Sequence, residues 1–193
     1  ATFDSKNFGT GKTVTANNIT LTGADAANYS QNTIATATAN ITRRPLTITG
    51  AFTVANRQYD ATTDANSQIT LPQVAGLSDV QSGDDAVLTG TPVFTFAQAT
   101  VGNSISISTS GYSVVGADAA NYSLTQPTFT ANITQRPLTI GGTLSVTSTK
   151  VYNRSNAAAI TDTSLLTLVN VPTGDENNPT KVALTSLTAT YDS

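Results

Sequence analysis

Paired carboxylates are the residues of this sequence whose type and spacing come closest to catalytic chemistry. Asp84 and Asp85 are neighbours, and so are Asp175 and Glu176, at matching places in two related stretches of the chain. General acid–base catalysis needs groups that converge on one substrate, whereas adjacent residues of an extended strand point to opposite faces. The chain also contains no His and no Cys, so the common nucleophile–base pairs are missing. The sequence therefore predicts no catalytic residue and a protein that is not an enzyme.

The same four carboxylates are also the candidates for a metal site. Calcium takes several oxygen ligands, and carboxylates beside glycine in extracellular β-domains can supply them. Gly83 and Gly174 do precede the two pairs, but acidic residues are sparse and the spacing of a calcium-binding loop is absent. A turn in which Asp caps backbone amides is the simpler interpretation. We therefore expect no cofactor, with calcium as the alternative, and melting curves with and without a chelator distinguish the two.

Tyr29 and Tyr122 recur within an identical stretch, GADAANYS, at 23–30 and 116–123. An exposed aromatic ring can stack on a sugar, so glycan binding is a function that we keep open. Recurrence at the same position is more typical of a structural corner, in which the tyrosine hydroxyl bonds back to a loop. We expect the structural role for both tyrosines.

These residues belong to a repeat that runs through the whole sequence. Residues 39–50 (ANITRRPLTITG) and 131–142 (ANITQRPLTIGG) differ at only two positions, and we name them the first seam and the second seam. The other matches lie at a spacing of about 93 residues, which is typical of a small β-sandwich domain. They are 1–14 with 94–107 and, through Tyr191, with 189–193; 57–62 with 150–155; and 80–85 with 171–176.

Each seam combines strand-like alternation with an Arg-Pro step. Proline cannot donate to a strand ladder, and it holds the residue before it in an extended conformation. Each seam therefore predicts the last strand of one module, a stiff joint of about two residues, and the first strand of the next module. With boundaries at Arg43 and Gln135, the chain divides into a C-terminal half-module, 1–42, one complete module, 43–134, and an N-terminal half-module, 135–193.

Period-two alternation within the complete module predicts short half-buried strands separated by turns rich in Gly, Asn and Asp. We expect them near 46–54, 68–71, 86–96, 104–109, 112–115 and 122–134. Such strands predict an all-β fold of tandem antiparallel, Ig-like β-sandwich modules of about 93 residues. A β-grasp-like arrangement is the alternative, because 60–67 and 156–166 are long enough to hold a short helix.

The apolar residues that alternate with Thr, Ser and Asn along these strands are the expected core, because one face of each strand must be buried. They are Phe52, Val54, Phe94, Phe96, Ile105, Ile107, Phe129, Ile133, Leu138 and Ile140.

Composition limits the classes of function. The 193 residues carry a net charge of -3, with 38% hydrophobic and 11% charged residues. A chain of this kind can build packed domains, but without clustered Lys and Arg it does not suit nucleic acid. Its apolar runs are only a few residues long, so we expect no membrane span and no signal peptide. The absence of Cys does not decide the redox compartment, but a large secreted bacterial protein that crosses membranes unfolded is one class in which it is expected. Because the sequence begins inside a pattern that recurs later, we interpret the chain as an excerpt of a longer protein.

The motifs of the complete module, taken in order, resemble the YDG-type repeat domain of bacterial surface proteins. They are YDAT at 59–62, SGDD at 82–85, the turn at Gly102, GADAANY at 116–122, and the seam strand. Such repeats occur in tandem in large secreted haemagglutinin-like adhesins. The name-giving Tyr-Asp-Gly is Tyr-Asp-Ala at 59–61 and Tyr-Asn-Arg at 152–154, which raises the question of whether the turn keeps its geometry without glycine.

Repeat and resemblance together imply a structural role: an extracellular stalk or fibre segment of a large bacterial cell-surface or secreted adhesin. Nearly linkerless joints should hold neighbouring modules at a restricted angle. The expected partners are neighbouring repeats and, because 1–42 and 135–193 are complementary halves, head-to-tail copies that build a fibre. The alternatives are an adhesive module that binds a glycan or surface and an extender rigidified by calcium.

Overall fold

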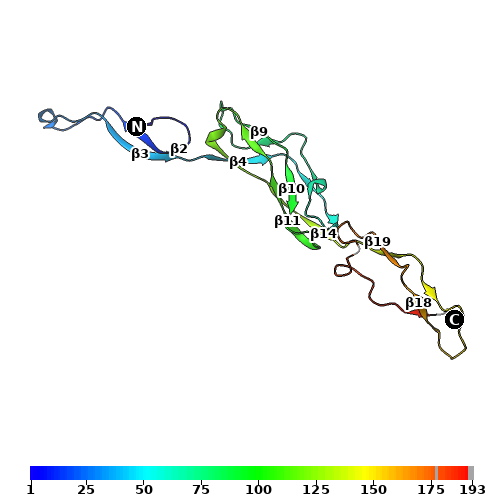
Figure 1. Cartoon of the computed structure of the whole chain (residues 1–193). Helices are drawn as coiled ribbons and strands as arrows, with labels where there is room; N and C mark the ends of the chain where they lie inside the picture. Colours follow the sequence, from blue (N-terminus) through cyan, green and yellow to red (C-terminus); the bar gives the residue numbers. More distant parts are fainter. Residues whose placement is uncertain (177, 191–193) are drawn as a thin grey trace. The chain divides into compact units, whose positions relative to one another are not determined.

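The computed structural model describes residues 1–176 and 178–190, and the regular elements in this part of the chain are β-strands and short 3-10 turns (Figure 1). The turns are η1 Ala26–Asn28, η2 Asn66–Gln68 and η3 Ala119–Asn121. The strands are β1 Thr2–Phe3, β2 Gly9–Ala16, β3 Ala35–Ile41, β4 Arg44–Thr49, β5 Thr53–Val54, β6 Arg57–Gln58, β7 Ile69–Thr70, β8 Gly76–Leu77, β9 Val87–Thr89, β10 Val93–Phe96, β11 Gly102–Ser110, β12 Ser113–Val115, β13 Tyr122–Thr125, β14 Thr128–Thr134, β15 Thr139–Gly141, β16 Ser145–Val146, β17 Ala157–Ala158, β18 Ile160–Asp162, β19 Thr167–Val169 and β20 Ala189–Thr190.

The predicted all-β, sandwich-like class is confirmed. Residues 60–67 contain only the start of η2, and 156–166 contain β17 and β18, so neither stretch holds the α-helix that a β-grasp arrangement needs. No helix in the described ranges is long and apolar enough to cross a membrane. Tyr191, which we predicted to occupy the aromatic position of a third repeat, lies outside the described residues.

The chain forms two compact units. Unit 1 consists of Ala1–Thr53, Thr70–Val93 and Thr109–Thr128, and unit 2 of Val54–Ile69, Phe94–Ser108 and Phe129–Ser193. This division follows contacts in space, whereas the module boundaries at Arg43 and Gln135 follow the repeat. The module boundaries therefore stay a prediction.

Unit 1 contains the first seam. Strands β1, β2 and β3 form an antiparallel sheet, with a bulge between Gly9 and Lys12. Strand β3 ends at Ile41 and β4 begins at Arg44, so only two residues separate them. Strand β4 pairs in parallel with β13 and antiparallel with β8, and β9 pairs antiparallel with β12. One strand thus leads directly into the next across this seam.

Unit 2 contains the second seam. Its largest sheet has the strand order β10-β11-β14-β6, in which β6 and β14 are parallel. Strand β14 ends at Thr134 and β15 begins at Thr139, so this connection is slightly longer than the first. Beyond it, β15 pairs with β19, β16 with β18 and β17 with β20, all antiparallel.

Two parallel pairings, β4–β13 and β6–β14, were not predicted from the sequence. Parallel neighbours need a long connection that returns the chain to the same end of the sheet. More than seventy positions separate the paired residues, such as Leu46 and Leu124 or Arg57 and Ile133. The local alternation that predicts a strand carries no information about a partner so far along the chain.

Among the described residues, every buried hydrophobic side chain lies within 43–134. The set is Leu46, Ala65, Ile69, Phe94, Phe96, Ile105, Ile107, Tyr122, Ala131 and Ile133. Burial was correctly predicted for five of them, namely Phe94, Phe96, Ile105, Ile107 and Ile133. Phe52 and Phe129 are half-buried, and the ring of Phe129 meets that of Phe94 edge-on at a centroid distance of 6.0 Å.

The predicted burial of Val54, Leu138 and Ile140 is wrong, because these side chains are 37%, 37% and 58% exposed. Leu46, which holds the place of Leu138 in the first seam, is fully buried in a strand that lies beside β13. Among the described strands, β15 has only β19 beside it. Val54 lies in a strand of two residues. Alternation identifies the residues that share a face, but burial needs a second layer over that face.

Candidate functional site

Of the four candidate carboxylates, Asp84 and Asp85 lie in unit 1 and Asp175 and Glu176 in unit 2. No cluster of three or more metal-ligating side chains occurs in 1–176 and 178–190. Asp85 caps a turn, as the simpler interpretation predicted: its Oδ2 accepts a hydrogen bond from the amide of Ala117 at 3.0 Å, and its own amide donates to Asp118 Oδ2 at 3.0 Å. Glu176 is exposed. Asp84 and Asp175 lie beside tyrosines, which makes them the carboxylates of interest.

Tyr122 forms the predicted structural corner. Its ring is buried, and its hydroxyl donates to Asp84 Oδ2 at 2.8 Å while accepting from the amide of Gln81 at 3.0 Å. The hydroxyl therefore ties β13 to the loop that follows β8. Tyr29, in the identical stretch of the first half-module, is 71% exposed, so the same sequence does not make a buried corner there.

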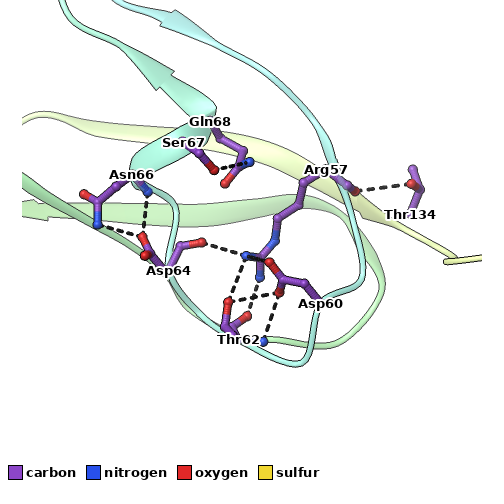
Figure 2. A network of polar contacts seen from close by, with 8 residues as sticks. All are labelled: Arg57, Asp60, Thr62, Asp64, Asn66, Ser67, Gln68 and Thr134. Atoms are coloured by element: carbon purple, nitrogen blue, oxygen red, sulfur yellow. Dashed lines mark hydrogen bonds and ion pairs between the residues drawn. The ribbon is translucent and has the colours of Figure 1, made fainter. Parts of the chain in front are cut away.

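A buried arginine organises the turn after β6, and Figure 2 shows its contacts. The Arg57 side chain is 5% exposed. Its Nη1 donates to Asp60 Oδ2 at 2.8 Å and to the Asp64 carbonyl oxygen at 2.6 Å, and its Nη2 donates to the carbonyl oxygen of Thr62. The guanidinium also lies 4.6 Å from the centroid of the Phe96 ring. A charged group can be buried when it is paired in this way.

The turn closes without glycine. Asp60 Oδ1 accepts hydrogen bonds from the amide and the hydroxyl of Thr62, both at 3.0 Å, which is an Asx-turn. Between them Ala61 has a φ of 64°, in the region that glycine adopts most easily. The carboxylate and the arginine thus hold alanine in the conformation that the turn requires.

The second copy of this turn repeats the arrangement with other residues. Lys150 replaces the arginine, and its Nζ donates to the carbonyl oxygens of Ser155 at 2.6 Å and Ala157 at 2.8 Å. Asn153 Oδ1 accepts from the amide of Ser155 at 3.1 Å, and Arg154 has a φ of 63°. The geometry therefore survives the loss of glycine in both copies, which answers the question that the sequence raised.

Contacts also cross the first seam. The Arg43 guanidinium lies 4.1 Å from the centroid of the Phe8 ring, and its Nε donates to the Ala120 carbonyl oxygen at 3.1 Å. The Phe8 amide donates to Asn121 Oδ1 at 2.8 Å. Arg43 therefore contacts the loop before β2 on one side and η3 on the other.

An ion pair accompanies these contacts. Lys6 Nζ lies 3.7 Å from Asp84 Oδ1 and 3.7 Å from Asp118 Oδ1. The lysine is mostly exposed, whereas the two carboxylates are largely buried. An ion pair of this kind contributes little by itself, but it places positive charge from 1–42 against negative charge from 43–134.

Contacts cross the second seam as well. The Tyr59 hydroxyl donates to Asp175 Oδ2 at 2.6 Å, and Lys181 Nζ binds Asp175 Oδ1 at 2.6 Å. The hydrogen bond from Lys181, and then that from Tyr59, lowers the pKa of Asp175 below its usual value. The bond to Asp175 in turn raises the pKa of the Tyr59 phenol. Asp175 is therefore an ionised acceptor that binds a neutral phenol and an ammonium group.

Several polar contacts occur in both copies of the repeat. In each copy the asparagine of the seam strand accepts a hydrogen bond from the amide of a residue with positive φ. In each copy the arginine before the seam proline donates to the carbonyl oxygen of a loop residue that also has positive φ. The pairs are the Gly11 amide with Asn40 Oδ1 at 2.8 Å, the Ser104 amide with Asn132 Oδ1 at 2.8 Å, Arg44 Nε with the Asp79 carbonyl oxygen at 2.7 Å, and Arg136 Nε with the Asn170 carbonyl oxygen at 2.5 Å.

Comparison with known protein families gives a match over most of the chain. A family model described as the YDG domain matches residues 1–39 and 42–129. The chain belongs to the YDG domain family. No curated protein and no solved structure matches it. We therefore name the turn around Ala61 the YDG turn, and the resemblance that the motifs indicated is confirmed.

Sequence reasoning missed the cation that holds the YDG turn. Arg57 and Lys150 occupy the same repeat position, two residues before the tyrosine, and this recurrence of positive charge was the available signal. The contacts of Arg43 with Phe8 and of Tyr59 with Asp175 left no such signal, because each joins residues far apart in the chain.

Replacing Ala61 with glycine is expected to stabilise the protein by about 0.5–1 kcal/mol, because alanine is strained at a φ of 64° and glycine is not. The free energy of unfolding, measured by denaturant titration, checks this. Ala97→Gly is the control, since that residue has no positive φ and the same change should destabilise slightly. A loss of stability in Ala61→Gly would mean that the YDG turn does not have this conformation.

Proposed function

We propose that this chain is a structural segment, a stalk or fibre portion of a large extracellular bacterial adhesin or related surface protein, and that its function is mechanical spacing. The observation that carries the proposal is the first seam, where one strand leads into the next through Thr42 and Arg43 and side chains from both sides of the seam meet. A connection this short leaves few free backbone torsions, so the angle between neighbouring modules is restricted.

The individual contacts across the first seam are weak, and the proposal depends on their combination. A cation–π contact such as that of Arg43 with Phe8 contributes about 0.5–1 kcal/mol at an exposed site. The ion pairs of Lys6 contribute at most about 1 kcal/mol. Because the short connection already limits the accessible angles, little further ordering entropy opposes these contacts.

We expect a pair of spin labels on opposite sides of the first seam to give a narrow distance distribution. The chain has no cysteine, so Thr36→Cys in β3 and Ser113→Cys in β12, both at exposed positions, can be labelled selectively. Insertion of a Gly-Ser pair between Thr42 and Arg43 is the control, and it should broaden the distribution. If the unmodified seam is as broad as the insertion variant, the spacing function is wrong.

A second copy of the chain is the partner that we propose beside the neighbouring repeats. Leu138 and Ile140 are exposed, whereas Leu46 is buried in a strand paired with β13. The stretch 23–30, identical to the one that leads into β13, carries the exposed Tyr29 and could supply that strand to another copy. Sedimentation over a range of concentrations tests this association, and Leu138→Asp should abolish it.

Glycan binding is the second candidate function, favoured by one observation. The Tyr29 ring is 71% exposed, and an exposed aromatic ring can stack on a sugar. A glycan screen with Tyr29→Ala as the control separates this candidate from mechanical spacing.

A further inference from the structure

The tyrosine of the YDG turn reaches a carboxylate on the far side of the second seam. Tyr59 lies 116 positions before Asp175, and the two side chains make the 2.6 Å hydrogen bond described above. We infer that Tyr59 holds its module at a fixed angle to the following one by binding Asp175, and we name this contact the lock. Asp175 lies in the loop with Gly174, and we name this loop and its repeat at Gly83 and Asp84 the Gly-Asp loops. This inference deepens the proposed spacing function and rests on it, because it assigns the residue that holds the joint.

The YDG turn and the end of β14 hold the backbone of Tyr59. The Tyr59 amide donates to the Thr134 carbonyl oxygen at 2.9 Å, at the end of the strand that enters the second seam. Two residues earlier Arg57 is clamped by the turn, and Asp60 on the other side closes the Asx-turn. Because its backbone is held on both sides, Tyr59 loses little conformational freedom when it binds across the seam.

The Asp175 carboxylate, which accepts the hydrogen bond from Tyr59, is stable in its buried position only with hydrogen-bond donors. Asp175 is only 5% exposed, and a buried carboxylate is costly unless both oxygens are hydrogen-bonded. Tyr59 binds Oδ2 and Lys181 binds Oδ1. Removal of the phenol hydroxyl therefore leaves one oxygen of a charged group without its donor, which favours an open joint that readmits water.

The equivalent loop in the preceding module faces its own seam in the same way. Asp84 occupies the place of Asp175 in the repeat, and Lys6 from the preceding half-module lies 3.7 Å from it. Asp84 Oδ2 also accepts from Tyr122 of its own module. A carboxylate has about four acceptor sites, so one Gly-Asp loop can bind a tyrosine of its own module and a donor from the preceding module together.

The chain contains a matched control for this tyrosine. Tyr152 holds the position of Tyr59 in the second copy of the YDG turn, and it is 85% exposed. Tyr152→Phe removes the same atom from the same kind of turn without removing a contact across a described seam. Tyr59→Phe thus removes the hydroxyl that binds across the second seam, and Tyr152→Phe removes a hydroxyl from an exposed ring.

The test uses the full chain labelled at Ser106→Cys in β11 and Thr167→Cys in β19, which are exposed positions on opposite sides of the second seam. We expect a narrow distance distribution that Tyr152→Phe leaves unchanged and Tyr59→Phe broadens. A hydrogen bond to a charged group shifts the equilibrium between closed and open joints by about tenfold. Phenylalanine keeps the ring, so the melting temperature of the Tyr59→Phe chain should stay near that of the parent chain.

The outcomes separate this inference from the proposed function. A narrow distribution that survives Tyr59→Phe overturns the lock and leaves the spacing function intact. A broad distribution in the parent chain overturns both at this seam. Ultraviolet titration gives an independent measurement. The pKa is raised for the phenols of Tyr59, Tyr112 and Tyr122, so Tyr59→Phe should lower the number of late-ionising phenols by one, whereas Tyr152→Phe should leave that number unchanged. If Tyr59→Phe leaves the number of late-ionising phenols unchanged, the inference is wrong.

Discussion

Replacing Phe96 with alanine is expected to lower the free energy of unfolding by about 3–5 kcal/mol. The ring is 2% exposed in β10, so the change removes buried apolar surface and leaves a cavity. It also removes the aromatic face that lies 4.6 Å from the Arg57 guanidinium. A loss of this size is comparable to the whole stability of a small domain, so the variant should be largely unfolded near room temperature. A denaturant titration measures the loss.

Phe3 is the matched control for this prediction. It occupies the same position of the repeat in β1, where it is 42% exposed, so Phe3→Ala should cost less than about 1 kcal/mol. If Phe96→Ala costs as little as Phe3→Ala, β10 does not carry a buried face and the register of this strand is wrong.

Replacing Arg57 with methionine is expected to destabilise the protein by about 3 kcal/mol. Methionine keeps most of the volume but removes the hydrogen bonds from the guanidinium to the carbonyl oxygens of Thr62 and Asp64, and a hydrogen bond to a charged group contributes about 1.5–3 kcal/mol. Asp60 loses its ion pair in the same change. Thermal unfolding followed by circular dichroism measures the effect.

Arg57→Lys separates the charge from the shape of this side chain. Lys150 makes the equivalent contacts in the second copy, where its Nζ donates to the carbonyl oxygens of Ser155 and Ala157. Arg57→Lys should therefore retain more than half of the stability that Arg57→Met loses. Equal losses in the two variants would show that packing against Phe96, and not the hydrogen bonds, is what matters.

Local sequence predicted the elements well where a turn residue or proline marks their ends. Each seam contains the end of one strand and the start of the next, β3 and β4 in the first seam and β14 and β15 in the second. In the first seam Arg44 and Pro45 belong to β4, so the predicted joint at Arg-Pro lies too far along the chain there. The break between β13 and β14 falls at Gln126 and Pro127, inside a stretch that we predicted as one strand. Proline explains that break, since its nitrogen cannot donate to a neighbouring strand.

The candidate site was less predictable than the fold. The corner formed by Tyr122 followed from its recurrence in the repeat, whereas the partner of Asp175 did not. Tyr59 and Asp175 lie 116 positions apart, and neither their spacing nor their neighbours identify them as a pair. A contact between residues so far apart in the chain cannot be read from a local pattern.

The sequence by itself determined the β-class, the repeat and the turns. Alternation of apolar and polar residues indicates strands, self-similarity shows the repeat, and the turns depend on hydrogen bonds between residues close together in the chain. Asp60 and Asn153 close the same turn in both copies for this reason. Only the tertiary structure decided which faces are covered. Leu46 and Leu138 stand in nearly identical stretches, yet one is buried and the other is exposed. Burial depends on a strand contributed from far along the chain, and β13 lies beside Leu46 but not beside Leu138.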